Sequence, residues 1–173
     1  MKIELRQLQK TEIPEFKREM QKAFQIGSEA VYGKTETQIL PESDIDRSLA
    51  AKGSAAFAAF AGGEMIGGAI VVLNKRSRRG HLDFLFVKVG VQGKGVGKVI
   101  WSKIERLYPD VKIWETCTPY FEKRNIHFYI NRCGFHAVEF FNSKHPDPND
   151  KKLPDAEKPD DDGMFRFEKV VKQ

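Results

Sequence analysis

The sequence predicts an α/β fold in which helices cover both faces of one mixed sheet. The chain has 173 residues, of which 40% are hydrophobic and 31% charged, which suits one globular domain. Segments with a two-residue period alternate with segments of helical period in the order β α α β β β α β α β β, and an alternation of this kind is typical of α/β proteins. We therefore expect a single domain over residues 1–173.

The first 53 residues are expected to form a strand and two helices. Residues 2–8 alternate between polar and apolar side chains, which predicts a strand. Thr11 is a candidate N-cap for a helix whose apolar residues recur at helical spacing (Ile13, Phe16, Met20 and Phe24). Ser43 opens a capping-box pattern that predicts a second, short helix ending near Gly53.

Three strands are expected in the middle of the chain. Residues 55–61 and 64–73 are separated by Gly62-Gly63, which is a hairpin turn signal. Residues 81–89 (HLDFLFVKV) carry apolar side chains on both faces, which is typical of a strand covered on both sides. This strand is expected at the centre of the sheet.

The remaining segments are expected to form two helices and three strands. A helix is predicted over 95–108, a strand over 111–117, and a second helix that ends near Cys133, where Gly134 suits the left-handed position after a helix. Strands follow at 136–141 and 165–171. Between them, residues 143–163 contain four prolines and many charges, which predicts a surface loop or insertion.

Composition and charge limit the partners, compartment and metal sites that are expected. The net charge is +5, and residues 72–106 hold nine basic and two acidic side chains, which permits nucleic acid, membrane headgroups or a phosphorylated ligand as partner. The N-terminus lacks the apolar stretch of a signal peptide, so a soluble, cytoplasmic protein is expected. Cys117 and Cys133 are expected to be free thiols, and no metal site is predicted because the four histidines form no ligand pattern.

A glycine-rich segment at 93–98 joins the strand at 81–89 to the helix at 95–108. A helix N-terminus has unpaired amides and carries about half an elementary positive charge, and glycines let the backbone approach a phosphate closely. Two common nucleotide motifs are excluded, since Val96 stands where a Walker A loop needs Lys and Lys98 stands where a dinucleotide fingerprint needs its third Gly. The junction is therefore predicted to be an anion site.

This junction resembles the pyrophosphate loop of the GNAT superfamily of N-acyltransferases, which reads Gln/Arg-x-x-Gly-x-Gly/Ala after a strand ending in Leu-x-Val. The corresponding residues here are Leu85-Phe86-Val87 and Gln92-Gly93-Lys94-Gly95-Val96-Gly97. A second element similar to the family, Asn125 to Gly134-Phe135, follows on the second helix. The resemblance covers residues 2–141 in element order and implies a mostly antiparallel central sheet of about seven strands flanked by about four helices.

The resemblance also implies acetyl-CoA as co-substrate, without a metal. In the family, the central strand pairs with the pantetheine arm as an added strand would, and the loop amides hold the pyrophosphate. The residues that this implies for coenzyme binding are Leu85, Phe86, Val87, Gln92, Gly93, Lys94, Gly95, Val96, Gly97, Lys98 and Asn125.

His81 and Asp83 are the candidate bases. An amine is protonated at neutral pH and must lose a proton before it attacks a thioester, so a base or a water relay is required. The two residues are two positions apart on one strand and therefore point to the same face. They also align with positions where some family members carry paired histidines. Either residue, or a water relay, is compatible with the sequence.

Tyr129 is the candidate acid that protonates the departing thiolate. In the family the corresponding tyrosine stands four residues before the glycine, whereas Tyr129 stands five before Gly134. One extra residue rotates a helical side chain by about 100°. Tyr129 is therefore shifted by a bulge in the helix or replaced in its role, and a core tyrosine with a satisfied hydroxyl is the alternative.

We predict an N-acyltransferase that moves an acetyl group from acetyl-CoA to a primary amine of a small molecule or peptide, by direct attack in a ternary complex. A non-catalytic acyl-CoA sensor and a basic nucleic-acid-binding domain using residues 72–106 are the alternatives. Neither nucleic acid nor membrane is expected as a partner. The acceptor, the acyl-chain length and the oligomeric state stay open, with a homodimer as one alternative.

Overall fold

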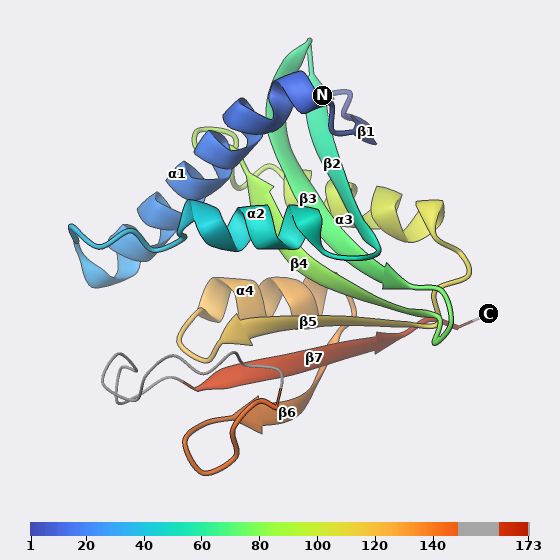
Figure 1. The fold of residues 1–173 in the computed structure, drawn as a ribbon. Helices are drawn as coiled ribbons and strands as arrows, with labels where there is room; N and C mark the ends of the chain where they lie inside the picture. The colour runs from blue at the N-terminus through green and yellow to red at the C-terminus, as the bar shows by residue number, and fades with distance from the viewer. Residues whose placement is uncertain (149–162, 173) are drawn as a thin grey trace. The chain divides into compact units, whose positions relative to one another are not determined.

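A computed structural model describes residues 1–148 and 163–172, which fall into two compact units, residues 1–111 (unit 1) and residues 112–173 (unit 2). The described residues contain seven strands and four α-helices, the α/β composition that the sequence predicts (Figure 1). Most of the expected insertion at 143–163 lies outside the described residues.

Unit 1 is built on four strands in the order β1 (Glu4–Gln7), β2 (Ser54–Ala61), β3 (Glu64–Asn74) and β4 (Arg79–Val87). Each strand is antiparallel to the next. The turn between β2 and β3 is the predicted one, with Gly62 and Gly63 at φ angles of 58° and 80°. Glycine adopts these left-handed angles without the strain that a Cβ would cause.

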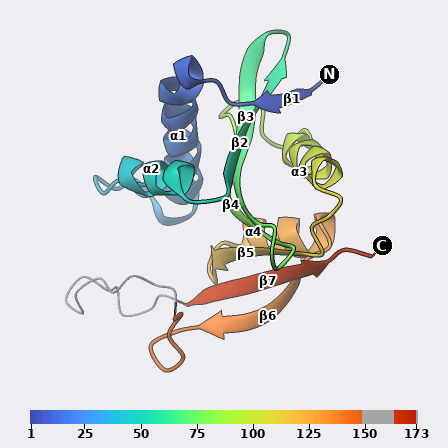
Figure 2. The same cartoon turned by 45° about the vertical axis from the view of Figure 1, so that its right-hand side comes forward.

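Three helices cover the two faces of this sheet: α1 (Ile13–Tyr32), α2 (Glu42–Ala50) and α3 (Val96–Leu107). Two consecutive glycines of β3 show where α1 and α3 lie. A Cβ at Gly68 would fall 2.5 Å from Phe16 of α1, and a Cβ at Gly67 would fall 3.0 Å from Ile100 of α3. Because neighbouring strand residues point to opposite faces, α1 and α3 lie on opposite sides of the sheet, as Figure 2 shows.

The two predicted helix caps are wrong by a residue or more. A short 3₁₀ turn, η1 (Lys10–Glu12), precedes α1, and Glu12 rather than Thr11 accepts a hydrogen bond from a backbone amide there, that of Gln9 at 2.9 Å. Helix α2 begins at Glu42 after Pro41, one residue before the predicted Ser43, with no side-chain cap. Glu42 in its first turn still complements the positive end of the helix.

Side chains of α1 hold the connection to α2 in place. Gln21 donates to the carbonyl of Leu40 at 3.1 Å, and the side-chain oxygen of Gln25 accepts from the amide of Ile39 at 2.9 Å. Lys17 forms ion pairs with two carboxylates at the start and middle of α2, those of Glu42 at 2.6 Å and Asp46 at 2.8 Å. The connection is therefore fixed to α1 by polar contacts along much of its length.

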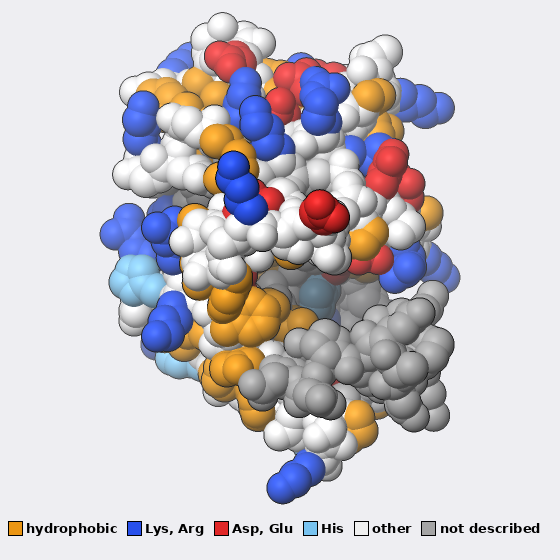
Figure 3. Space-filling model, turned by 90° about the vertical axis from the view of Figure 1, so that its left-hand side faces the viewer, with side chains coloured by type: hydrophobic (Ala, Val, Ile, Leu, Met, Phe, Trp, Pro, Cys, Tyr) orange, Lys and Arg blue, Asp and Glu red, His pale blue; other side chains and the backbone are white. Residues whose placement is uncertain are grey.

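The face of unit 1 that carries α1 and α2 mixes Lys and Arg with Asp and Glu side chains, as the upper part of Figure 3 shows. A surface of this kind lacks the single-sign field that attracts a polyanion over a wide area. No helix in the described part of the chain is both long and apolar enough to cross a membrane.

Unit 2 contains three antiparallel strands, with β7 (Met164–Val170) between β5 (Ile113–Pro119) and β6 (His136–Phe141). One face of this sheet is covered by α4 (Lys123–His127), which continues directly into a π-helical turn, η2 (Phe128–Arg132). Tyr129 in this turn packs against Phe135 and Phe167, with ring centroids 5.7 and 6.1 Å apart.

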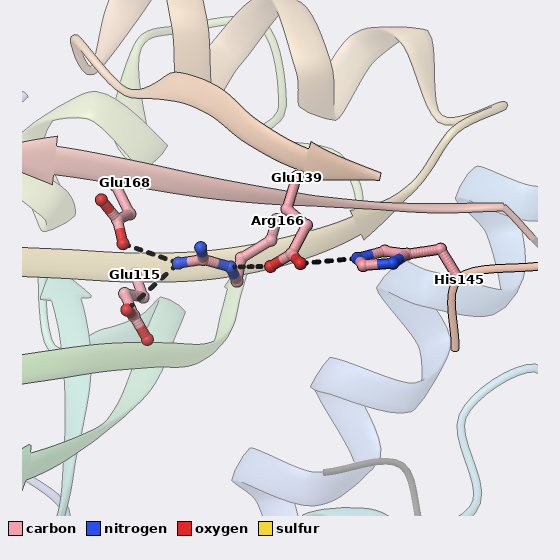
Figure 4. A network of polar contacts seen from close by, with 5 residues as sticks. All are labelled: Glu115, Glu139, His145, Arg166 and Glu168. Atoms are coloured by element: carbon pink, nitrogen blue, oxygen red, sulfur yellow. Dashed lines mark hydrogen bonds and ion pairs between the residues drawn. The ribbon is translucent and has the colours of Figure 1, made fainter. Parts of the chain in front are cut away.

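The opposite face of the unit 2 sheet carries a polar network centred on Arg166 (Figure 4). Arg166 contacts Glu168 at 2.6 Å, Glu139 at 2.9 Å and Glu115 at 3.3 Å, so it joins all three strands. His145 extends the network by a contact with Glu139 at 2.7 Å. Hydrogen bonds from His145 and then Arg166 hold the pKa of Glu139 below its ordinary value.

We expect this network to make the stability of the fold depend on pH. A carboxyl group whose folded pKa is lowered stabilises the fold above its unfolded pKa, and this contribution is lost as the pH falls through the folded pKa. Glu139→Gln should therefore lower the melting temperature at pH 7 and have a smaller effect near pH 3. Thermal unfolding followed by circular dichroism at both pH values measures the difference.

Glu36→Gln, at an exposed position between α1 and α2, is the matched control and should change neither value appreciably. Equal melting-temperature losses for Glu139→Gln at both pH values would show that the carboxylate contributes nothing through its charge.

Candidate active site

A β-bulge in β4 sets the geometry of the candidate base. The pairing with β3 runs Ile70 with Phe84 and then Val71 with Leu82, so Asp83 is an extra residue without its own partner. Phe84 nevertheless meets Phe24 of α1, with ring centroids 6.1 Å apart. The bulge therefore lets the consecutive side chains of Asp83 and Phe84 lie on the same face of the sheet.

His81, Asp83 and Ser48 form a hydrogen-bonded chain on that face. His81 Nδ1 lies 2.6 Å from Asp83 Oδ1, which confirms that the two predicted residues share a face. The Ser48 hydroxyl of α2 donates to the other oxygen, Asp83 Oδ2, at 2.6 Å. The His81 side chain is 38% exposed and that of Asp83 is 24% exposed, so the imidazole is the more accessible group.

The two candidate bases differ in their hydrogen-bond environments. Both oxygens of Asp83 already accept hydrogen bonds, one from each neighbour. A carboxylate beside Nδ1 favours the imidazole tautomer with its proton on Nδ1, and the lone pair is then on Nε2. The geometry therefore favours His81 as the proton acceptor and Asp83 as its orienting partner.

Ser48 is the one residue of the hydrogen-bonded series His81–Asp83–Ser48 that was not predicted from the sequence. It is only 6% exposed, and it lies one helical turn from Ile45, which is fully buried. A serine among the apolar residues of a helix indicates a hydrogen-bond partner, because burying an unpaired hydroxyl costs free energy. The sequence does not show which partner compensates, since Asp83 is 35 residues away.

The predicted pyrophosphate loop follows directly on β4. Gln92 donates its side-chain amide to the carbonyl of Val87 at 3.3 Å, which ties the loop to the end of the strand. Gly93 and Gly95 have φ angles of 79° and 77°, in the left-handed region that glycine tolerates. A Cβ at either position would meet no atom within 4 Å, so their backbone faces open space.

The start of α3 has the features of an anion site. Its N-cap is Gly95, no side chain caps its first turn, and no acidic residue lies there. Helices α1 and α2 instead have Glu15 or Glu42 in their first turns. Lys94 next to the N-cap is exposed and Lys98 is partly exposed, so both can add positive charge.

The strand residues predicted to meet the coenzyme differ in burial. Phe86 is 3% exposed, and its ring packs edge-on against Phe16 at 5.2 Å, so its side chain belongs to the core. Leu85 and Val87 are partly exposed. The pairing of the β4 backbone with the pantetheine arm, which the family resemblance implies, stays a prediction.

The two remaining predicted residues lie in unit 2. Asn125 of α4 donates to the Thr118 hydroxyl at 3.3 Å. Tyr129 is 9% exposed, and burial raises the pKa of its phenol, although a hydrogen bond with Thr116 acts in the opposite direction. The structure therefore places the Tyr129 hydroxyl in the interior of unit 2, with a partner on β5.

The extra residue between Tyr129 and Gly134 is accommodated by the π-helical turn. The amide of Cys133 bonds to the carbonyl of Phe128, five residues earlier, at 3.0 Å. Gly134 then takes the predicted left-handed conformation, at φ 83°. The backbone thus contains the helix bulge that the residue spacing allows, and the role of Tyr129 stays a prediction.

Cys117 and Cys133 are both free thiols, as predicted. Within residues 1–148 and 163–172, no three His, Cys, Asp or Glu side chains gather closely enough to hold a metal ion.

Comparison with known proteins identifies the family. The model of the acetyltransferase (GNAT) family matches residues 14–135, which is most of the chain and includes β4, the glycine loop and α4. The chain belongs to the GNAT family of acetyltransferases. This membership confirms the predicted superfamily and the prediction of an acyltransferase enzyme.

Individual relatives agree with this assignment. The chain is 38% identical over 176 residues to the uncharacterized protein YrkN of Bacillus subtilis, covering 99% of this chain and 95% of that protein. Its fold is similar to that of the PaiA N-acetyltransferase of Thermoplasma acidophilum in complex with coenzyme A, with a TM-score of 0.69, 16% identity, and coverage of 99% of this chain and 100% of that chain. It is also similar to the ribosomal-protein-S18-alanine N-acetyltransferase of Escherichia coli, with a TM-score of 0.72, 13% identity, and coverage of 99% and 96%. At these identities, the two structures show that the GNAT fold is shared.

Proposed function

We propose that this GNAT protein transfers the acetyl group of acetyl-CoA to a primary amine, with both substrates bound at once. The observation that carries the proposal is the start of α3, where a glycine loop leads from β4 into a first turn with neither a side-chain cap nor an acidic residue. Such a turn offers its amides and positive dipole end to a pyrophosphate. Two proteins with a similar fold support the proposal: the PaiA N-acetyltransferase is in complex with coenzyme A, and the Escherichia coli protein is a ribosomal-protein-S18-alanine N-acetyltransferase.

The residues of this chain have distinct tasks in the proposed reaction. The amine nitrogen attacks the thioester carbon, the carbon–nitrogen bond forms, and the carbon–sulfur bond breaks as the thiolate leaves. His81 accepts the ammonium proton on Nε2 while Asp83 holds Nδ1. A backbone amide of β4 near Val87 is proposed to stabilise the oxyanion, and Tyr129 to return a proton to the thiolate.

The first experiment identifies the amine acceptor. Release of coenzyme A should be followed with acetyl-CoA and a panel of polyamines, amino acids, aminoglycosides and peptides with free N-termini. We expect at least one amine to raise the release rate well above the hydrolysis rate without acceptor, with the acetylated amine found by mass spectrometry. Tight coenzyme binding without transfer to any amine would favour the acyl-CoA sensor instead.

We expect Gly97→Val to weaken coenzyme binding strongly. Gly97 lies in the first turn of α3, where a β-branched side chain would occupy the space that a pyrophosphate needs. Titration calorimetry with coenzyme A alone measures the affinity. Gly27→Val in α1 is the matched control, because a Cβ at Gly27 meets no atom within 4 Å and Gly27 has no predicted contact with the coenzyme. Equal affinities of the two variants for coenzyme A would show that the loop is only a structural turn.

His81→Gln should lower the turnover number by at least about tenfold and remove the acid limb of the rate profile. The acid limb is expected because a protonated imidazole cannot accept the ammonium proton. Steady-state rates from pH 5 to pH 9 with the identified acceptor measure it. His136→Gln, at an exposed position on β6, should leave the profile unchanged. An unchanged acid limb in His81→Gln would assign proton removal to solvent.

Tyr129→Phe separates a catalytic from a core role. A proton donor predicts a lower turnover number with unchanged coenzyme affinity, because only a transition-state interaction is removed. Loss of the hydrogen bond to Thr116 alone predicts a loss of about 1 kcal/mol of unfolding free energy with turnover preserved. Turnover and urea denaturation on one preparation distinguish the two, and a fully active variant excludes Tyr129 as the acid.

A further inference from the structure

Ser48 occupies a position at which an apolar side chain would be expected. The residues of α2 that are buried against the sheet are Ile45 and Ser48, one turn apart. Serine forms helices less readily than alanine, and a buried hydroxyl is costly unless it is hydrogen-bonded. Its hydrogen bond to Asp83 Oδ2 offsets that cost and links α2 to β4.

Asp83 needs such a contact to keep a fixed orientation. It is the extra residue of a β-bulge, its side chain is 24% exposed, and water competes for its oxygens. With the Ser48 hydroxyl on Oδ2 and His81 Nδ1 on Oδ1, the carboxylate is held from both sides. A carboxylate that rotated toward solvent would leave His81 Nδ1 without this acceptor.

We propose that Ser48 is a positioning residue that, through Asp83, keeps the proton of the His81 imidazole on Nδ1. The tautomer matters because the two ring nitrogens of a neutral imidazole have opposite roles, one as donor and one as acceptor. Only the Nδ1–H form presents a lone pair on Nε2. Ser48 thus acts on a reaction that it does not touch, and its catalytic effect rests on the proposed role of His81 as base.

The ring nitrogens of His81 report this role directly and without substrate. Nitrogen-15 NMR of histidine-labelled protein, at a pH where the imidazole is neutral, distinguishes the two tautomers, and the His81 signals are assigned by their loss in His81→Gln. We expect the Nδ1–H form to dominate in the wild-type protein and a shift toward the Nε2–H form in Ser48→Ala. Ser43→Ala removes the same hydroxyl from an exposed position of the same helix and should leave the tautomer unchanged.

Turnover supplies the second readout. Ser48→Ala should lower kcat by about fivefold to tenfold, as expected for the loss of one typical hydrogen bond, while KM for acetyl-CoA changes by less than about twofold. Ser48→Thr keeps the hydroxyl and should retain the wild-type tautomer and kcat. A purely structural serine would instead lower the melting temperature of Ser48→Ala without changing the His81 tautomer.

The Nδ1–H form persisting in Ser48→Ala would overturn the proposal, whatever the turnover. Two other failures would look different: His81→Gln would keep its full rate with the identified amine if His81 were not the base, and no amine would raise coenzyme release if the proposed function were wrong. The NMR result and the rate of His81→Gln therefore test Ser48 and the base assignment separately.

Discussion

The extra residue at Asp83 determines which side chains β4 presents to α1 and α2. Without it, strict alternation would place Asp83 and Phe84 on opposite faces of the sheet. With it, the carboxylate reaches Ser48 of α2 while Phe84 and Phe86 still pack against aromatic rings of α1. A polar cluster and an apolar core thus share one sheet face, and the irregular backbone of the bulge is what permits the change between them.

The contacts that fix α2 have a related consequence. Lys17 of α1 holds the start and middle of the helix through Glu42 and Asp46, and Ser48 holds its end through Asp83. The two ion pairs involve exposed carboxylates and contribute little to stability, whereas the Ser48 hydroxyl is buried and its hydrogen bond to Asp83 is partly shielded from water. Near Asp83, α2 is therefore held by the apolar packing of Ile45 and by the hydrogen bond of one hydroxyl group.

The sequence predicts the elements well because periodicity and glycine positions report local backbone preferences. All seven strands and four helices lie close to their predicted ranges, and the turns at Gly62-Gly63 and Gly134 have the expected left-handed φ angles. The pairing of His81 with Asp83 also follows from their spacing on a strand. The bulge at Asp83 and the contact with Ser48 do not follow, because both depend on which residues of β3 and α2 lie opposite β4. The predicted helix starts were wrong for local reasons: the η1 turn, closed by the contact of Glu12 with the amide of Gln9, includes Thr11, and Pro41 is the extended residue before α2.

The π-helical turn at Phe128–Arg132 has a consequence for how this chain is aligned with its relatives. A single-residue insertion in an α-helix is absorbed most locally when one turn widens and the turns on either side keep their phase. An alignment that places Tyr129 opposite the family tyrosine therefore requires a one-residue gap between Tyr129 and Gly134. An alignment without this gap would match the family tyrosine with Ile130 instead of Tyr129. For GNAT sequences with this spacing, the position of the gap is thus better decided from backbone hydrogen bonds than from residue similarity.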